Sequence, residues 1–171
     1  LHSDSVAYAG GIFSWIRETY LADSRIWVSV VPDKGYYLAK ANGYPSMDYD
    51  GLVRQLKEQM PYASYVNLFD TLSADDYYRT DTHWRQERLI PAARKIAESL
   101  GVTVPEFEQK QLDRPFYGVY YGQAALPMEP DVLYYLTNEM LEGCTVKIHD
   151  NGQTAEVLDQ TKLQSKDLYD V

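Results

Sequence analysis

Two apolar runs on either side of one amphipathic segment constrain the fold of this chain more than any other feature. Residues 26–31 form a continuous, β-branched run, which is typical of a strand buried on both faces, and residues 65–69 form a second apolar run. Between them, Ser46 or Asp48 caps a predicted helix that Pro61 ends. A strand, a helix and a strand of these lengths predict a βαβ unit with parallel strands.

The rest of residues 1–101 completes a predicted α/β portion. Apolar residues at three- and four-residue steps predict a helix over residues 5–21, and another helix is predicted over residues 84–100. The aromatic loop after the first strand, residues 32–45, should face the loop after the second strand, residues 70–83. This follows because loops that leave the carboxyl ends of parallel strands converge on the ligand crevice of an open α/β sheet.

Residues 102–171 predict a β-rich continuation of the same domain or an insertion in it. Residues 102–114 are polar and are expected to be irregular, whereas Asp150-Asn151-Gly152 predicts the turn of a hairpin. Cys144, at the start of one alternating run, is predicted to be a small buried hydrophobe, and His149 a surface residue. The predicted strands span residues 116–121, 131–136, 145–149 and 155–158.

Composition excludes some partners and favours others. The net charge of −9 argues against nucleic acid, because a phosphate backbone needs clustered Lys and Arg. The single cysteine excludes an internal disulfide and a cysteine-based metal cluster. Sixteen tyrosines favour polyhydroxyl ligands such as carbohydrates, although many of these rings are expected to line the core. No apolar run approaches the ~20 residues that a bilayer span requires.

Residues 75–84 concentrate the acid–base chemistry of the sequence. His83 lies two positions after Asp81, so the two side chains share one side of an extended backbone or meet across a tight turn. A histidine that an aspartate orients can take and return a proton as a general base. Two alternatives remain: Asp81 and Thr82 only cap the next helix, or Asp81 and His83 bind a metal with Asp75 or Asp76.

The run Tyr77-Tyr78-Arg79-Thr80-Asp81-Thr82-His83-Trp84 resembles the motif of the DHHW family and of the related alginate O-acetylation proteins. Two further segments resemble those that flank the motif in DHHW proteins: Val31-Pro32-Asp33-Lys34, and Phe116 to Tyr121 followed by Pro130-Asp131-Val132. The resemblance implies an SGNH-hydrolase-like (flavodoxin-like) parallel sheet with flanking helices, incomplete in this chain.

The resemblance also implies an activity. Asp81 would orient His83, and His83 would activate a serine in a Gly-Asp-Ser-like turn on a separate segment. None of the serines of this chain follows Gly-Asp. We therefore expect either a carbohydrate esterase or polysaccharide O-acetyltransferase whose serine lies outside this chain, or a degenerate, non-catalytic carbohydrate-binding or scaffolding module.

Substrate contacts are expected from both facing loops and from the motif, with no metal and no cofactor. The expected partners are a polysaccharide or acetylated glycan and a membrane-bound O-acyltransferase. The resemblance suggests an extracytoplasmic protein, periplasmic or at the bacterial cell surface, with a membrane anchor upstream. The residues predicted to bind substrate are Lys34, Tyr37, Tyr78, Arg79 and Trp84.

Overall fold

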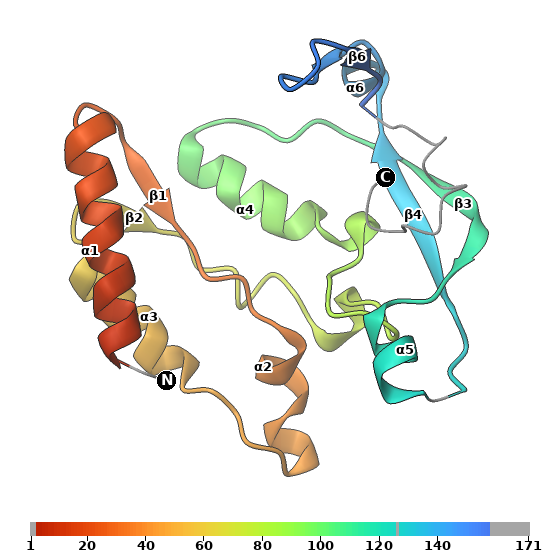
Figure 1. Cartoon of the computed structure of the whole chain (residues 1–171), viewed down its shortest axis with the longest axis horizontal. Coiled ribbons are helices and arrows are strands. Elements are labelled where there is room, and N and C mark those ends of the chain that lie inside the picture. The colour runs from red at the N-terminus through yellow and green to blue at the C-terminus, as the bar shows by residue number, and fades with distance from the viewer. Residues whose placement is uncertain (1–2, 126, 158–171) are drawn as a thin grey trace. The chain divides into compact units, whose positions relative to one another are not determined.

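The computed structural model describes residues 3–125 and 127–157, and their contacts divide the chain into two units (Figure 1). The first unit contains residues Leu1–Tyr77 and Arg88–Val104, and the second contains Tyr78–Glu87 and Pro105–Val171. The motif residues 78–84 thus make their contacts with the C-terminal part of the chain. Each unit is a small mixed α/β structure with short sheets.

The first unit contains the predicted parallel strand pair. Strand β1 (Ile26–Val28) pairs with β2 (Ala63–Tyr65) in parallel, and helix α3 (Tyr49–Gln59) precedes β2. The parallel strand–helix–strand order is confirmed, but the second strand lies at residues 63–65 and not at the predicted 65–69. Both strands are only three residues long and are half-buried rather than buried on both faces. The reason is that β1 and β2 form a sheet of two strands among the described residues, so neither strand lies between two others.

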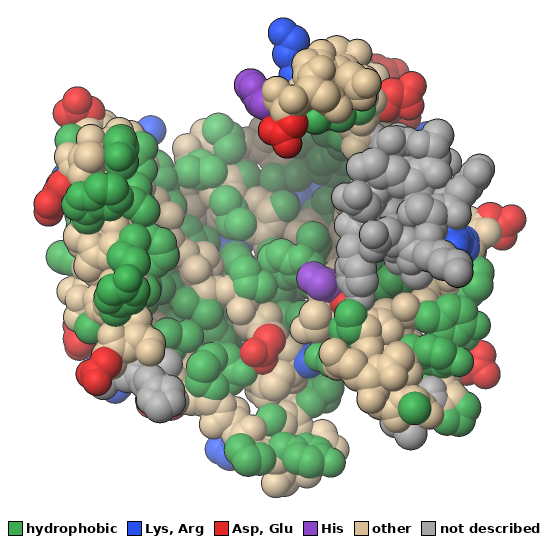
Figure 2. Space-filling view, viewed as in Figure 1, with side chains coloured by type: hydrophobic (Ala, Val, Ile, Leu, Met, Phe, Trp, Pro, Cys, Tyr) green, Lys and Arg blue, Asp and Glu red, His purple; other side chains and the backbone are tan. Residues whose placement is uncertain are grey.

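Two long helices flank this strand pair, and α1 (Ser3–Tyr20) packs against α3. The packing is close at Gly10, where an added Cβ would lie 2.6 Å from Cβ of Gln59. Figure 2 shows hydrophobic side chains gathered along α1. Helix α4 (Ile90–Leu100) follows the short helix η3 (Gln86–Arg88) and ends at Gly101, whose φ of 74° forms the left-handed cap that favours glycine.

Residues 32–45 were predicted to form a loop, but the first part of this segment is helical. Helix α2 (Lys34–Leu38) begins there because the Asp33 side chain accepts a hydrogen bond from the backbone N–H of Tyr36 at 3.1 Å and so caps the first turn. The short helices η1 (Lys40–Asn42) and η2 (Ala74–Asp76) complete the unit. Asp33, a cap residue three positions before the donor N–H of Tyr36, is the sequence signal that the loop interpretation overlooked.

In the second unit, β3 (Glu108–Phe116) pairs with β4 (Asp131–Thr137) in antiparallel register. Strand β4 was predicted. Residues 102–107 are irregular, as expected, but the expectation was wrong for residues 108–114, because β4 supplies hydrogen-bond partners to this polar segment. The register shifts between Gln111 and Pro115, since a proline has no N–H to donate to the ladder.

The predicted strand over residues 116–121 was also wrong. Helix α5 (Val119–Ala124) occupies its second half, because the backbone N–H groups of Val119 and Tyr120 donate to Asp81 and to the carbonyl of Thr80 instead of a neighbouring strand. The conformation of this segment therefore depends on the motif loop, about forty residues earlier in the sequence, against which the short helix packs.

The end of the second unit contains α6 (Glu139–Glu142) and the hairpin of β5 (Val146–Lys147) and β6 (Thr154–Ala155). The antiparallel pairing of β5 with β6 confirms the predicted hairpin, and His149 is exposed beside its turn as expected. Cys144 is exposed, not buried, because it follows α6 at the surface. Residue 158, in the last predicted strand, lies outside the described residues. Over the described ranges, no helix is long and apolar enough to cross a membrane.

Candidate active site

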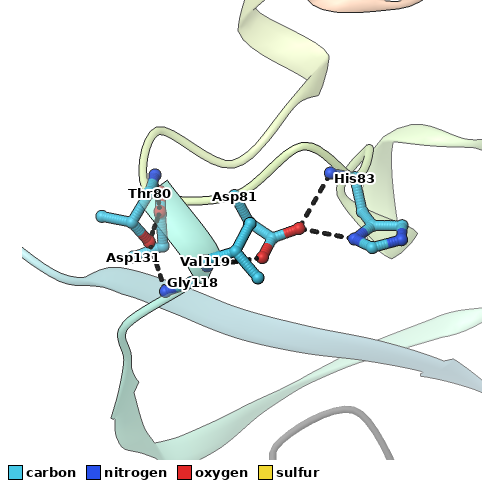
Figure 3. A network of polar contacts seen from close by, with 6 residues as sticks. All are labelled: Thr80, Asp81, His83, Gly118, Val119 and Asp131. Carbon is cyan, nitrogen blue, oxygen red and sulfur yellow. Dashed lines mark hydrogen bonds and ion pairs between the residues drawn. The ribbon is translucent and has the colours of Figure 1, made fainter. Parts of the chain in front are cut away.

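The site is built within the second unit from the loop of residues 78–83, the junction of β3 with α5, and the start of β4 (Figure 3). The loop closes on itself where the backbone N–H of Tyr78 donates to the carbonyl of His83 at 3.1 Å. Residues that are far from the loop in sequence then form hydrogen bonds with it. The result is a tight turn that presents one histidine and one aspartate together.

Asp81 and His83 form a hydrogen-bonded pair. Nδ1 of His83 lies 2.5 Å from Oδ1 of Asp81, and the same carboxylate oxygen accepts the backbone N–H of His83 at 2.9 Å. Asp81 is completely buried, whereas the His83 side chain is 63% exposed. A carboxylate can only accept, so Nδ1 donates and the neutral ring keeps its acceptor lone pair on Nε2. The pair therefore has the tautomer that a general base requires.

The second carboxylate oxygen of Asp81 is held by the start of α5. Oδ2 accepts the backbone N–H of Val119 at 3.0 Å, so both oxygens of the buried carboxylate have donors. Gly118 makes this contact possible, since an added Cβ would lie only 2.4 Å from both Cβ of Asp81 and the carbonyl oxygen of Thr80. Burial and three hydrogen bonds fix the orientation of Asp81, and Asp81 in turn fixes the ring of His83.

Asp131 clamps the base of the loop, a role that the sequence analysis missed. Its Oδ1 accepts the backbone N–H of Arg79 at 2.9 Å, and its Oδ2 accepts the backbone N–H and the hydroxyl of Thr80, each at 2.7 Å. The Thr80 hydroxyl also accepts the backbone N–H of Gly118 at 2.9 Å, and Thr80 is completely buried. The sequence did point to this residue, because Pro130-Asp131-Val132 belongs to a segment that resembles DHHW proteins. It did not indicate which contacts Asp131 would make.

The predicted substrate residues of the motif lie in different surroundings. Tyr78 is only 7% exposed, and its ring packs edge-on against Phe116 with centroids 5.2 Å apart. Arg79 is exposed, with Nη2 at 3.4 Å from the carbonyl oxygen of Pro130, and Trp84 is half-buried. Tyr78 thus supports the loop from inside, while Arg79 presents a cation at the surface. Their contact with a substrate stays a prediction.

Lys34 and Tyr37 belong to α2 in the first unit. Lys34 is the first residue of that helix and is half-buried. The Tyr37 ring packs against Tyr36 and Tyr77, and burial, with the nearby Tyr77 next in importance, raises the pKa of its hydroxyl. Their approach to Asp81 and His83 stays a prediction.

The metal alternative finds no support in the part of the chain that is described. No group of three or more His, Cys, Asp or Glu side chains there could hold a metal ion. Asp76, one of the proposed ligands, instead accepts hydrogen bonds from the backbone N–H and the hydroxyl of Ser73 at 2.7 and 2.9 Å. Ser73 and Asp76 thereby form the capping box of η2.

The buried Tyr78 predicts a pH dependence of stability. Burial, and next the Glu87 carboxylate, raises the pKa of Tyr78 to about 12 from its ordinary value of 10.0. The folded state therefore favours the protonated phenol, and this stabilisation is complete below pH 10 and is lost as the pH rises through 12. Between these values the free energy of unfolding should fall more steeply for the natural chain than for Tyr78→Phe, by about 1.4 kcal/mol per pH unit. Denaturant titrations at several pH values measure this, and equal slopes would contradict it.

Comparison with known proteins was made against families, curated proteins and solved structures. A scan against protein-family models found no match, and a search of the curated proteins found none that matches. Among solved structures, the chain is similar to a DHHW family protein from Eubacterium siraeum, with a TM-score of 0.66 and 22% identity, over 78% of this chain and 48% of that one. The chain thus spans about half the length of that structure. At this identity the likeness concerns the fold, and the fold agrees with the DHHW resemblance of residues 77–84.

Proposed function

We propose that this chain supplies the Asp–His half of the catalytic site of an SGNH-like carbohydrate esterase or polysaccharide O-acetyltransferase. The observation that supports the proposal is the buried Asp81 carboxylate, which contacts Nδ1 of the exposed His83 at 2.5 Å. Here the orienting group is buried and the proton-accepting group faces outward, as a general base requires.

The proposed reaction passes an acetyl group through a serine on a segment outside this chain. The serine Oγ attacks the acetyl carbonyl carbon while Nε2 of His83 takes the Oγ proton. When the tetrahedral adduct collapses, the bond from the carbonyl carbon to the sugar oxygen breaks, and that oxygen takes the proton from Nε2. Water or a second sugar hydroxyl then attacks the acetyl-serine, and His83 takes and returns the proton again. The products are acetate or a newly acetylated sugar.

The proposal extends to the setting of this reaction. The substrate would be an acetylated glycan or a polysaccharide, and a membrane-bound O-acyltransferase is the partner that would deliver acetyl groups. Such a protein would act outside the cytoplasm, at the cell surface or in the periplasm. Arg79 and Trp84 flank the pair in sequence and are the motif residues that we expect to contact the glycan.

Acetate release by the natural full-length protein tests the proposal. We expect turnover of 4-nitrophenyl acetate and of acetylated xylan, together with labelling by a fluorophosphonate that traps an activated serine. An acceptor glycan, supplied with the aryl acetate, distinguishes transfer from hydrolysis, because transfer yields an acetylated glycan. A protein that neither turns over nor labels, with or without acceptor, would contradict the proposal.

A non-catalytic carbohydrate-binding module is the second candidate. It is favoured by the absence of a Gly-Asp-Ser serine from this sequence. Under this candidate the Asp81–His83 pair only holds the loop, and glycan affinity persists without turnover. The labelling experiment separates the two candidates, because only an activated serine reacts with the fluorophosphonate.

A further inference from the structure

We propose that the first unit binds a neutral polysaccharide chain in a groove along α3, a site distinct from the Asp81–His83 pair. The groove starts in a pocket of about 500 Å³, within the size range of ligand sites. An adjoining hollow of about 450 Å³ shares Asp50, Val53 and Lys57 with the pocket. Because the two hollows share these residues of α3, one ligand of several linked sugars can contact both.

Aromatic rings form one wall of the pocket. Tyr36 contacts Phe69 and Tyr49 edge-on, with centroids 4.6 and 5.1 Å apart, so its ring is held rigidly although it is 39% exposed. Tyr49 is fixed in turn by its hydroxyl, which donates to Asp33 at 2.7 Å. A rigid, exposed ring offers the apolar C–H face of a pyranose a flat surface at little entropic cost.

Polar groups from α3 and from the segment after β2 also line the pocket. Asp50, Val53 and Lys57 follow at helical spacing, and all three line the pocket, with Asn67 on the segment after β2. The Lys57 ammonium lies 4.5 Å from the centre of the Tyr65 ring, which holds the cation at the edge of the pocket. Carboxylate, amide and ammonium groups beside an aromatic wall can bond the ring hydroxyls of a sugar.

The charge of the groove selects the class of glycan. Its ionisable side chains balance, since Asp50 and Glu58 are matched by Lys57 and Arg54, whereas the whole chain carries a net charge of −9. A polyanion would gain nothing inside the groove and would be repelled by the rest of the protein. A neutral glycan avoids this cost, so we assign the groove to neutral sugars.

This inference rests on the proposed function only for its biological context, and its measurement does not require turnover. The groove, in the first unit, would hold the polymer while the Asp81–His83 pair, in the second unit, acts on one acetyl group. Binding energy from non-reacting parts of a substrate is a general means of directing catalysis.

Binding of neutral hexasaccharides tests the groove. Cellohexaose, xylohexaose and mannohexaose are titrated into the natural protein, with hexagalacturonate as the charged comparison, and nuclear magnetic resonance follows the amides of Lys57 and Asn67. We expect saturable shifts with at least one neutral probe and none with hexagalacturonate. Tyr36→Ala and Asp50→Asn should each raise the Kd about tenfold, through loss of ring stacking and of a charged hydrogen bond.

Matched controls keep the test decisive. Tyr44→Ala, at a tyrosine that is 69% exposed and does not line the groove, and Asp23→Asn should leave the Kd unchanged. Asp50 is exposed, so its substitution tests the groove even if Tyr36→Ala weakens folding. No shift with any neutral probe up to about 10 mM would overturn the inference, as would tighter binding of hexagalacturonate. Turnover without hexasaccharide binding would overturn the groove alone, and binding without turnover would overturn the esterase proposal alone.

Discussion

Replacement of His83 by Ala should lower acetate release by the natural protein by roughly four to six orders of magnitude, because the proposed general base is lost. Folding should be almost unaffected. The His83 side chain is 63% exposed, so its removal opens no cavity. The buried Asp81 carboxylate keeps the backbone N–H groups of His83 and Val119 as donors. Initial rates with 4-nitrophenyl acetate, together with the free energy of unfolding, measure both expectations.

A second histidine provides the control for this experiment. His149 is exposed beside the turn between β5 and β6, so His149→Ala makes the same chemical change in the same unit. It should leave the rate unchanged. Asp81→Asn is the informative companion, because an amide cannot hold Nδ1 as a donor with the same strength. If His83→Ala retains activity within tenfold of the natural protein, the pair is not a catalytic dyad.

Elements whose formation depends on neighbouring residues could be predicted from local sequence patterns. Helix α3 follows from apolar residues at helical spacing, and the parallel pairing of β1 with β2 follows from the lengths of the segments around it. The proximity of Asp81 and His83 was predictable for the same reason. Only Thr82 separates the pair in sequence, so a turn is enough to join them.

The parts that sequence reasoning missed depend on contacts over long separations. Asp131 reaches the backbone of Arg79 and Thr80 across about fifty residues, and no periodicity encodes such a contact. The amides of Val119 and Tyr120 have the motif loop as partner, so an alternating aromatic segment becomes a helix. In both cases the local structure is determined by a backbone N–H group whose hydrogen-bond acceptor lies far away in the sequence.

Substitution of Gly118 by Ala should be the most damaging change of a single methyl group in the second unit. The φ of Gly118 is −73°, an ordinary value for any residue, so the cost is steric and not conformational. The new Cβ would lie 2.4 Å from Cβ of Asp81 and from the carbonyl oxygen of Thr80, and 2.6 Å from Oδ2 of Asp81. Backbone atoms on one side leave no flexible group to move aside, so α5 must separate from the loop. We expect a loss of about 2–4 kcal/mol in the free energy of unfolding.

The same separation should disable the site, because the hydrogen bond from Val119 N–H to Asp81 breaks and the carboxylate no longer holds His83. Acetate release should therefore fall at temperatures where the variant is still folded. Gly122→Ala is the matched control, since Gly122 lies in the same helix and an added Cβ meets nothing within 4 Å. It should leave turnover unchanged and stability equal or slightly higher, as expected for alanine in a helix. A Gly118→Ala protein as stable and as active as the Gly122→Ala protein would show that α5 does not hold Asp81 in place.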